Sequence, residues 1–202
     1  MGRRTGKILL VWALGVVLCA PGLAAAMVIN FDSNIELDGH VPTDYLGFSW
    51  GANWWTIKNS SFQSNWFNTG DFPSLPNAAH NSGLTTLAIS FPALYDVTSA
   101  HFRSWSWQDT FYDSSARRVT VKAYRGISLE GTRVVDLSPG AMVLTPLNFD
   151  GVDKLEFITE QFKSWLVDDI TINQVPLPGA LVLLGVGIVR LVAYSRRRRS
   201  LA

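Results

Sequence analysis

The sequence has very little of the side-chain chemistry on which most enzymes and disulfide-linked secreted proteins depend. Its 202 residues include one cysteine, Cys19, which lies inside an apolar N-terminal segment, so no disulfide framework or cysteine nucleophile is expected in the body of the protein. The three histidines, His40, His80 and His101, lack the H-E-x-x-H spacing of zinc proteases, and we expect them to be isolated surface residues. No G-x-S-x-G elbow is present. These absences favour a non-enzymatic protein.

Charge is also scarce, and it is unevenly distributed. Charged residues make up 16% of the chain, against about 25% in a typical soluble protein. All 16 acidic residues lie between Asp32 and Asp169, where nine of the 17 basic residues leave a net charge of −7. A nucleic-acid-binding protein would carry a basic body, so we expect no nucleic-acid partner. The remaining basic residues flank apolar runs at the two ends, which is typical of membrane topology.

The first 26 residues have the pattern of a secretory signal peptide. A basic region precedes a 13-residue apolar run at positions 8–20, and the Ala-x-Ala of residues 24–26 supplies a cleavage site before Met27. The alternative is an uncleaved anchor helix, because apolar residues continue to Ile29. We expect residues 1–26 to be a signal peptide.

A second apolar segment lies close to the C-terminus. Residues 177–194 are interrupted by one charge, Arg190, and a membrane-spanning helix needs about 20 residues. Pro176 and Pro178 favour an extended entry, because proline ends a strand and is tolerated only at the start of a helix. The segment is closed by a basic cluster expected on the cytoplasmic side: Arg196, Arg197, Arg198 and Arg199. The simplest interpretation is a single transmembrane helix.

These three parts together resemble the PEP-CTERM sorting signal of Gram-negative bacteria. The resemblance covers residues 175–199, and its proline motif is Val175, Pro176, Leu177 and Pro178. Leu177 stands where the family usually has glutamate, and Arg190 within the helix is a second departure. The resemblance implies export across the inner membrane and a membrane-anchored precursor. It also implies cleavage near the proline motif by exosortase, a membrane cysteine transpeptidase, and delivery to the cell surface or the extracellular space.

The body of the chain, residues 27–174, has the pattern of a β-domain. Residues 117–125 show a period of two, in which Val119 and Val121 share one face and Thr120 and Lys122 share the other. Eight comparable runs occupy residues 27–31, 84–91, 97–107, 117–125, 132–138, 142–149, 152–159 and 165–172. Turn signals such as "LSPG" and "NFDG" separate successive runs. The pattern predicts an all-β fold, an antiparallel jelly-roll-like β-sandwich, between an N-terminal signal helix and a C-terminal transmembrane helix.

Four short motifs in this body are similar to those of a secreted β-sandwich domain common ahead of PEP-CTERM signals. They are "INFD", "PTDYLGFSW", "NAAHNSG" and "LVDDITI". The similarity implies the fold and no particular activity.

An aromatic-rich stretch, residues 48–72, is a candidate ligand-binding surface. Its tryptophans, Trp50, Trp54, Trp55 and Trp66, are interleaved with asparagine, serine and threonine. Exposed aromatic faces can stack on sugar rings while polar side chains bind the hydroxyl groups. The alternative is that these rings pack in the core, because aromatic side chains dominate buried area.

Two aspartates are candidate ligands of a structural calcium ion. Asp32 follows the first predicted strand and Asp168 lies in the last, and such strands often lie side by side in a sandwich. Calcium takes about six to eight oxygen ligands. In jelly-roll carbohydrate-binding modules an aspartate two residues before an inward isoleucine often binds calcium, and Asp168 matches that position because Ile170 and Ile172 share its parity. The alternative is a pair of solvated turn carboxylates.

These features lead to one principal hypothesis and two alternatives. The first is a non-catalytic exported protein of the cell surface or extracellular matrix, sorted by its C-terminal signal, with an exosortase-type transpeptidase and the membrane as partners. The second is a carbohydrate-binding module that holds extracellular polysaccharide. An extracellular hydrolase is the third, because a pair of carboxylates that are distant in sequence can meet in space.

Overall fold

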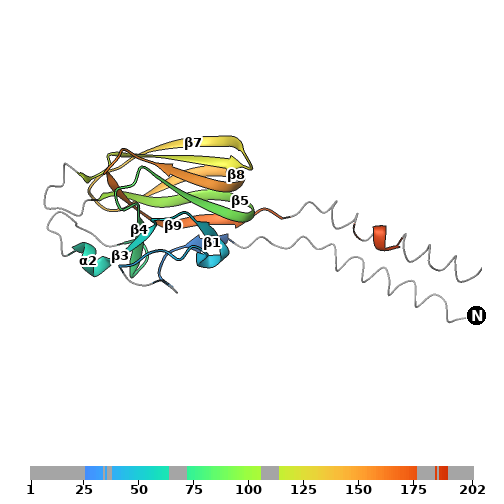
Figure 1. Ribbon diagram of the computed structural model, residues 1–202, viewed down its shortest axis with the longest axis horizontal. Helices are drawn as coiled ribbons and strands as arrows, with labels where there is room; N and C mark the ends of the chain where they lie inside the picture. The colour runs from blue at the N-terminus through green and yellow to red at the C-terminus, as the bar shows by residue number, and fades with distance from the viewer. Residues whose placement is uncertain are drawn as a thin grey trace, which may run out of the picture. The chain divides into compact units, whose positions relative to one another are not determined.

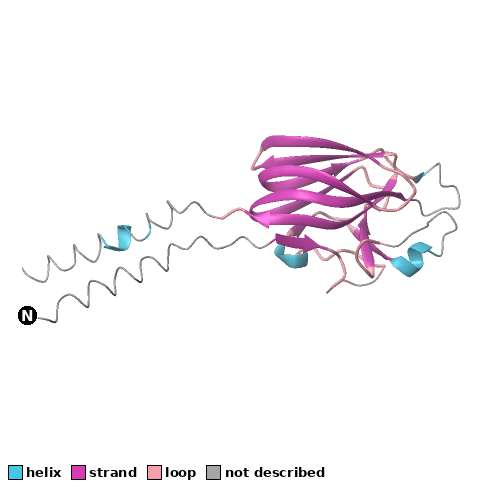
Figure 2. Ribbon diagram, turned by 180° about the vertical axis from the view of Figure 1, so that it is seen from behind, coloured by secondary structure: helices cyan, strands magenta, loops and turns pink. Residues whose placement is uncertain are grey.

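The described part of the chain is almost entirely β-structure. The computed structural model describes residues 26–33, 35, 38–63, 72–105, 114–176, 185 and 187–190. Its elements within these ranges are β1 (Ala26–Ile29), the 3-10 turn η1 (Tyr45–Gly47), β2 (Ser49–Trp50), β3 (Trp55–Lys58), the short helix α2 (Asn59–Gln63), β4 (Asn77–His80), β5 (Thr86–Trp105), β6 (Arg118–Arg125), β7 (Ser128–Asp136), β8 (Val143–Ile158) and β9 (Ser164–Gln174). The predicted all-β, antiparallel class is confirmed (Figures 1 and 2).

Two long strands organise the sheet. The strand order is β3-β4-β9-β5-β8-β6-β7, with β1 added to β9 and β2 added to β5, and every named ladder is antiparallel. The first part of β5 pairs with the last part of β8, which also pairs with β6. Beyond residue 95, β5 pairs instead with β9 and with the first part of β8. Because both strands bend, one continuous sheet supplies two layers (Figure 1).

The main core lies between these layers. Val119 and Val121 of β6 are fully buried in the same cluster as Ile170 and Ile172 of β9, which belong to the other part of the sheet. Thr120 and Lys122 of β6 remain partly exposed, so the predicted period of two is confirmed. The sheet therefore forms a β-sandwich whose inward side chains come from strands far apart in sequence.

The structure corrects four of the predicted strands. Residues 84–91 and 97–107 were expected to be separate strands, and β5 joins them; residues 142–149 and 152–159 are joined in β8. The "NFDG" stretch therefore bends a strand rather than ending one. Asn148 and Gly151 adopt positive φ values of 51° and 58°, which asparagine and glycine tolerate best, and the ladder resumes beyond them.

Two of the edge segments of the sandwich in the described part of the chain are β7 and the first part of β8. In the described part of the chain, β7 pairs only with β6, and residues 143–149 of β8 pair only with β5. Edge strands expose main-chain donors and acceptors on one side. This open side of the sandwich is where side chains from β7 and β8 come together.

Most of the predicted terminal segments lie outside the described residues. Residues 25–175 form one compact unit, and the remainder of the chain is assigned to a second. The described residues include no helix that is both long enough and apolar enough to span a membrane.

Candidate functional site

A polar cavity of about 470 Å³ lies beside the edge strand β7. Its lining comes from the β6–β7 hairpin and from the bend of β8: Arg125, Glu130, Gly131, Thr132, Arg133, Asn148, Phe149 and Asp150. These segments are more than ten residues apart in sequence, and the bend in β8 brings them together. Polar side chains that converge on a concave surface make this cavity a candidate ligand-binding site.

The two arginines of this cavity are held in place by main-chain carbonyl groups. Arg125 donates from Nε to the carbonyl of Gly151 at 2.7 Å and from Nη2 to the carbonyl of Asp150 at 3.2 Å. Arg133 donates from Nε to the carbonyl of Leu147 at 3.0 Å. Both guanidinium groups therefore bind carbonyls of the bent strand, and none of the hydrogen bonds among the described residues uses their remaining N–H groups.

The two carboxylate residues of the described cavity lining, Glu130 and Asp150, form no ion pair with its arginines. Among the described residues, neither guanidinium lies within 4.0 Å of an aspartate or glutamate oxygen. Glu130 and Asp150 also line the cavity and supply carboxylate acceptors. The lining thus offers fixed donors and separate acceptors, which is what a ligand with several hydroxyl groups requires.

Phe149 supplies the apolar part of the lining. Its side chain is almost completely buried, and a Cβ placed on Gly131 would lie 2.9 Å from two of its ring atoms. Glycine at this position therefore lets the ring approach the main chain of β7 closely.

The predicted tryptophan surface is not formed by Trp50 and Trp54. Both rings are buried in the main core, where they pack edge to face at 5.3 Å between ring centroids. Their indole N–H groups donate to the carbonyls of Tyr45 and Ala88, so burial leaves neither donor unsatisfied. For these two residues the core interpretation is correct.

The other two tryptophans differ from that pair. The partly exposed Trp55 ring lies 3.7 Å from the ring of His40, centroid to centroid. Trp66 lies outside the described residues. Of the three candidate tryptophans within the described residues, Trp55 is the one whose side chain is partly exposed.

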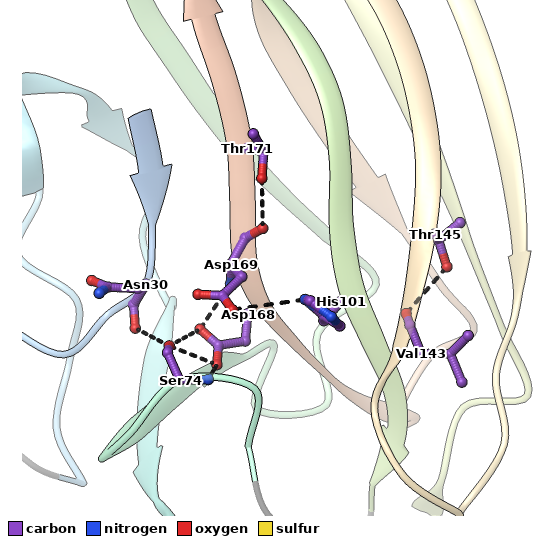
Figure 3. A network of polar contacts seen from close by, with 8 residues as sticks. All are labelled: Asn30, Ser74, His101, Val143, Thr145, Asp168, Asp169 and Thr171. Atoms are coloured by element: carbon purple, nitrogen blue, oxygen red, sulfur yellow. Dashed lines mark hydrogen bonds and ion pairs between the residues drawn. The ribbon is translucent and has the colours of Figure 1, made fainter. Parts of the chain in front are cut away.

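Asp168 lies in a buried polar network that joins three parts of the chain (Figure 3). Its carboxylate is fully buried and accepts from the Ser74 hydroxyl at 3.1 Å and from the Asp169 main-chain N–H at 2.8 Å. The same Ser74 hydroxyl lies 3.4 Å from the carbonyl of Asn30, just beyond β1. Burial, and then the neighbouring Asp169 carboxylate, raise the pKa of Asp168 to about 8.

The parity predicted for the end of β9 is wrong. Asp168 was expected to share a face with Ile170 and Ile172, but both isoleucines lie in the main core while Asp168 contacts Ser74 outside it. The cause is a bulge: Asp169 adopts a φ of 49°, and the β5–β9 register shifts between Ser99 and His101. The extra residue reverses the alternation, so that Asp169 also reaches His101, 3.8 Å away from its carboxylate (Figure 3).

The carboxylates of Asp32 and Asp168 both affect the pKa of the buried Tyr45 hydroxyl. Tyr45 is 4% exposed, and its hydroxyl lies close to the side chain and the main chain of Ser33. Burial raises the pKa of this hydroxyl most; hydrogen bonding with Ser33 lowers it in part, and the carboxylates of Asp32 and Asp168 raise it further. The carboxylate of Asp32 also accepts from the main-chain N–H of Asn77 at 3.0 Å.

These groups fit a hard cation in kind, since they are carboxylate, carbonyl and hydroxyl oxygens. Asp168, Asp32 and the carbonyl of Asn30 would be the ligands of a calcium ion, and the ion would favour the ionised form of Asp168. The described residues contain no group of three or more histidine, cysteine, aspartate or glutamate side chains placed to hold a metal. The calcium site therefore stays a prediction.

The histidines are not all surface residues. His80 is fully buried, packs edge to face on Trp105 and accepts from the Ser82 N–H at its Nδ1 atom. Burial lowers the pKa of His80 to about 3, so the side chain is neutral at physiological pH. The expectation of an isolated surface histidine is wrong there because β4 lies between β3 and β9, with both faces covered.

Only the beginning of the predicted sorting motif lies within the described residues. Val175 donates from its main-chain N–H to the carbonyl of Leu94, and Pro176 follows it with an exposed side chain. Leu177, Pro178 and the arginine cluster, Arg196 to Arg199, lie outside the described residues.

Comparisons with known proteins identify distant structural likenesses. No protein-family model matches the sequence, and no curated protein matches it. A carbohydrate-binding module, CBM61, solved in complex with β-1,4-galactotriose, is similar over 68% of this chain and 99% of its own, with 10% identity and a TM-score of 0.37. The CBM22-1–GH10 modules of Clostridium thermocellum xylanase 10B, solved with xylohexaose, are similar over 74% of this chain and 28% of their own, with 10% identity and a TM-score of 0.38.

Proposed function

We propose that the chain is an exported, non-catalytic protein whose jelly-roll-like β-sandwich binds extracellular polysaccharide. The observation that carries the proposal is the cavity beside β7, where guanidinium, carboxylate, amide and hydroxyl groups converge next to Phe149. A sugar ring presents several hydroxyl groups, each of which is both a donor and an acceptor. Planar side chains such as arginine, asparagine and the carboxylates can contact two such groups at once.

The fixed position of the arginines supports the same proposal. A side chain already held by the protein loses little conformational entropy when a ligand binds. Arg125 and Arg133 are held by carbonyls of β8, so their remaining N–H groups keep a defined direction. This fixed geometry should raise the affinity for a polysaccharide segment, because each contact of such a ligand contributes little free energy and a small entropy cost therefore matters.

The proposal also includes export and sorting, which are supported by the sequence patterns of residues 1–26 and 175–199. Residues 1–26 act as a signal peptide, and an exosortase-type transpeptidase recognises residues 175–199 and cleaves near Pro176 and Pro178. The domain of residues 27–174 then reaches the cell surface or extracellular matrix of a Gram-negative bacterium. The intact mass of protein recovered from a host with such a sortase tests this part: loss of the residues beyond the proline motif is expected, and a chain that keeps them through Ala202 contradicts it.

The binding function is tested by affinity electrophoresis of the full chain, in detergent, through gels that contain individual polysaccharides. Retardation in at least one gel is expected, and Glu130→Ala should reduce it. Glu160→Ala is the matched control, because Glu160 is also exposed and lies in the turn before β9, outside the cavity. Equal mobility in every gel would contradict the proposal. Release of reducing sugar from a retarding polysaccharide would favour the alternative of an extracellular hydrolase.

A further inference from the structure

We infer that the cavity beside β7 recognises the carboxylate group of an acidic sugar, so that the polysaccharide it binds contains uronic acid. This inference rests on the proposed function and narrows the class of ligand. It is carried by the two arginines, by the way in which they are held, and by the absence of an ion pair between either arginine and a carboxylate of the described residues.

The arginine donors available to a ligand form a fork. Arg133 uses its Nε atom to hold the carbonyl of Leu147, and none of the described hydrogen bonds involves its two Nη groups. A guanidinium group has five N–H donors in one plane, and its geometry matches the two oxygens of a carboxylate. The Nη pair of Arg133 is therefore a bidentate site whose direction is set by the bond on the opposite side of the group.

Arg125 supplies a second positive charge at the same cavity. Its Nε and Nη2 atoms hold the carbonyls of Gly151 and Asp150, and its Nη1 atom makes none of the described hydrogen bonds. An arginine and a carboxylate, both ionised, frequently form two parallel hydrogen bonds, which add geometric specificity as well as energy. A carboxylate ligand thus gains more from these arginines than a hydroxyl group in the same position would.

The acidic residues of the cavity fit the sugar hydroxyls rather than its carboxylate. Glu130 and Asp150 line the cavity without forming an ion pair to either arginine in the described part of the chain. They are acceptors for hydroxyl groups, and they would repel a carboxylate bound in the opposite orientation. The two kinds of side chain together favour one orientation of a uronate ring.

The ligand itself offers the first test, because it requires no change in the protein. The full chain in detergent is titrated with polygalacturonate and with alginate, and each polymer is compared with its carboxyl-reduced form. At least about tenfold weaker binding of the reduced form is expected for the polymer that binds, from the loss of a charge-assisted bidentate contact. Equal affinity for the two forms overturns this inference and leaves the proposed function intact. Binding only to neutral polysaccharides also overturns the inference alone, and binding to no polysaccharide overturns both.

The protein offers a matched set of variants. Arg133→Gln should weaken binding of the acidic polymer at least about tenfold, and Arg133→Lys, which keeps the charge but loses the fork, should recover only part of that loss. Arg118→Gln is the control, since Arg118 lies at the other end of the β6–β7 ladder and pairs with Asp136 outside the cavity. Melting curves establish that each variant is folded. A folded Arg133→Gln that binds as well as Arg118→Gln overturns the inference.

Discussion

The ring of Phe149 on β8 lies directly against the main chain of Gly131 on β7. A Cβ built on Gly131 would be 2.9 Å from the Cδ1 and Cε1 atoms of that ring, closer than real Cβ contacts allow. The ring and the glycine therefore fix the spacing between the two edge strands that line the cavity.

Substitution of Gly131 should destabilise the protein through this ring. Gly131→Val should lower the free energy of unfolding by about 1–3 kcal/mol, the usual cost of overpacking. Because Phe149→Leu shortens the opposing side chain, the double variant should recover part of the loss. A double-mutant cycle from urea unfolding measures the coupling, and additive effects would show that the ring and the added side chain do not compete.

The fold could be predicted largely from alternation, and the cavity could not. The period of two in β6 depends on side chains of one short segment, which local sequence reports well. The cavity depends on a bend at Asn148 and Gly151, whose turn-forming residues were interpreted as the end of a strand. One signal was available: Arg125 and Arg133 stand at positions that alternation assigns to the core face, beside Ala123 and Val135. A charged residue on a core face indicates a strand end or edge that opens to solvent.

The calcium hypothesis shows a similar limit. The sequence correctly placed Asp168 on β9, but a bulge at Asp169 moved its side chain away from the face of Ile170. A bulge inserts one residue and reverses every later side chain, and a stretch of alternating letters does not reveal it. The aromatic stretch allowed two interpretations, because sugar-stacking surfaces and hydrophobic cores use the same aromatic residues. The sequence does not show that Trp54 is buried while Trp55 is partly exposed; the packing in the structure does.

The tryptophans should therefore differ in what they contribute to stability. Trp54→Ala removes a ring that packs on Trp50 and Phe157 in the core, and it should cost about 3–5 kcal/mol. Trp55→Ala should cost clearly less, because its ring is partly exposed. Chemical denaturation compares the two variants, and a larger loss for Trp55→Ala would contradict the assignment of Trp54 to the core.

Calcium should stabilise the protein if Asp32 and Asp168 share an ion. Calcium at about 100 times its dissociation constant would add about 2.7 kcal/mol by mass action on the native state. Asp168→Asn should abolish the gain, whereas Asp136→Asn, at an exposed carboxylate on β7, should keep it. Differential scanning calorimetry with calcium and with EDTA makes the comparison. A melting temperature that does not respond to calcium would count against the site.

Without calcium, stability should fall as the pH rises from 6.5 to 8. The folded pKa of Asp168 is about 8 and its ordinary value is 3.8, so in this window the native state binds a proton that the unfolded chain has lost. His80, with a folded pKa of about 3 against 6.5, acts in the opposite direction, and its contribution fades as the pH rises above 6.5. The free energy of unfolding should decrease by up to about 1.4 kcal/mol per pH unit. Urea unfolding in EDTA at several pH values tests this. If the free energy of unfolding depends on pH in the same way in Asp168→Asn as in the wild type, a group other than Asp168 causes the dependence.

The central claim is that polysaccharide binds in the cavity between β7 and the bend of β8, and amide hydrogen exchange tests it most directly. The full chain is compared with and without the polysaccharide that retards it in affinity gels. Slower exchange is predicted in residues 125–133 and 148–151, while β4, on the far part of the sheet, should be unchanged. Protection confined to other residues, such as those around Trp55, would contradict the account.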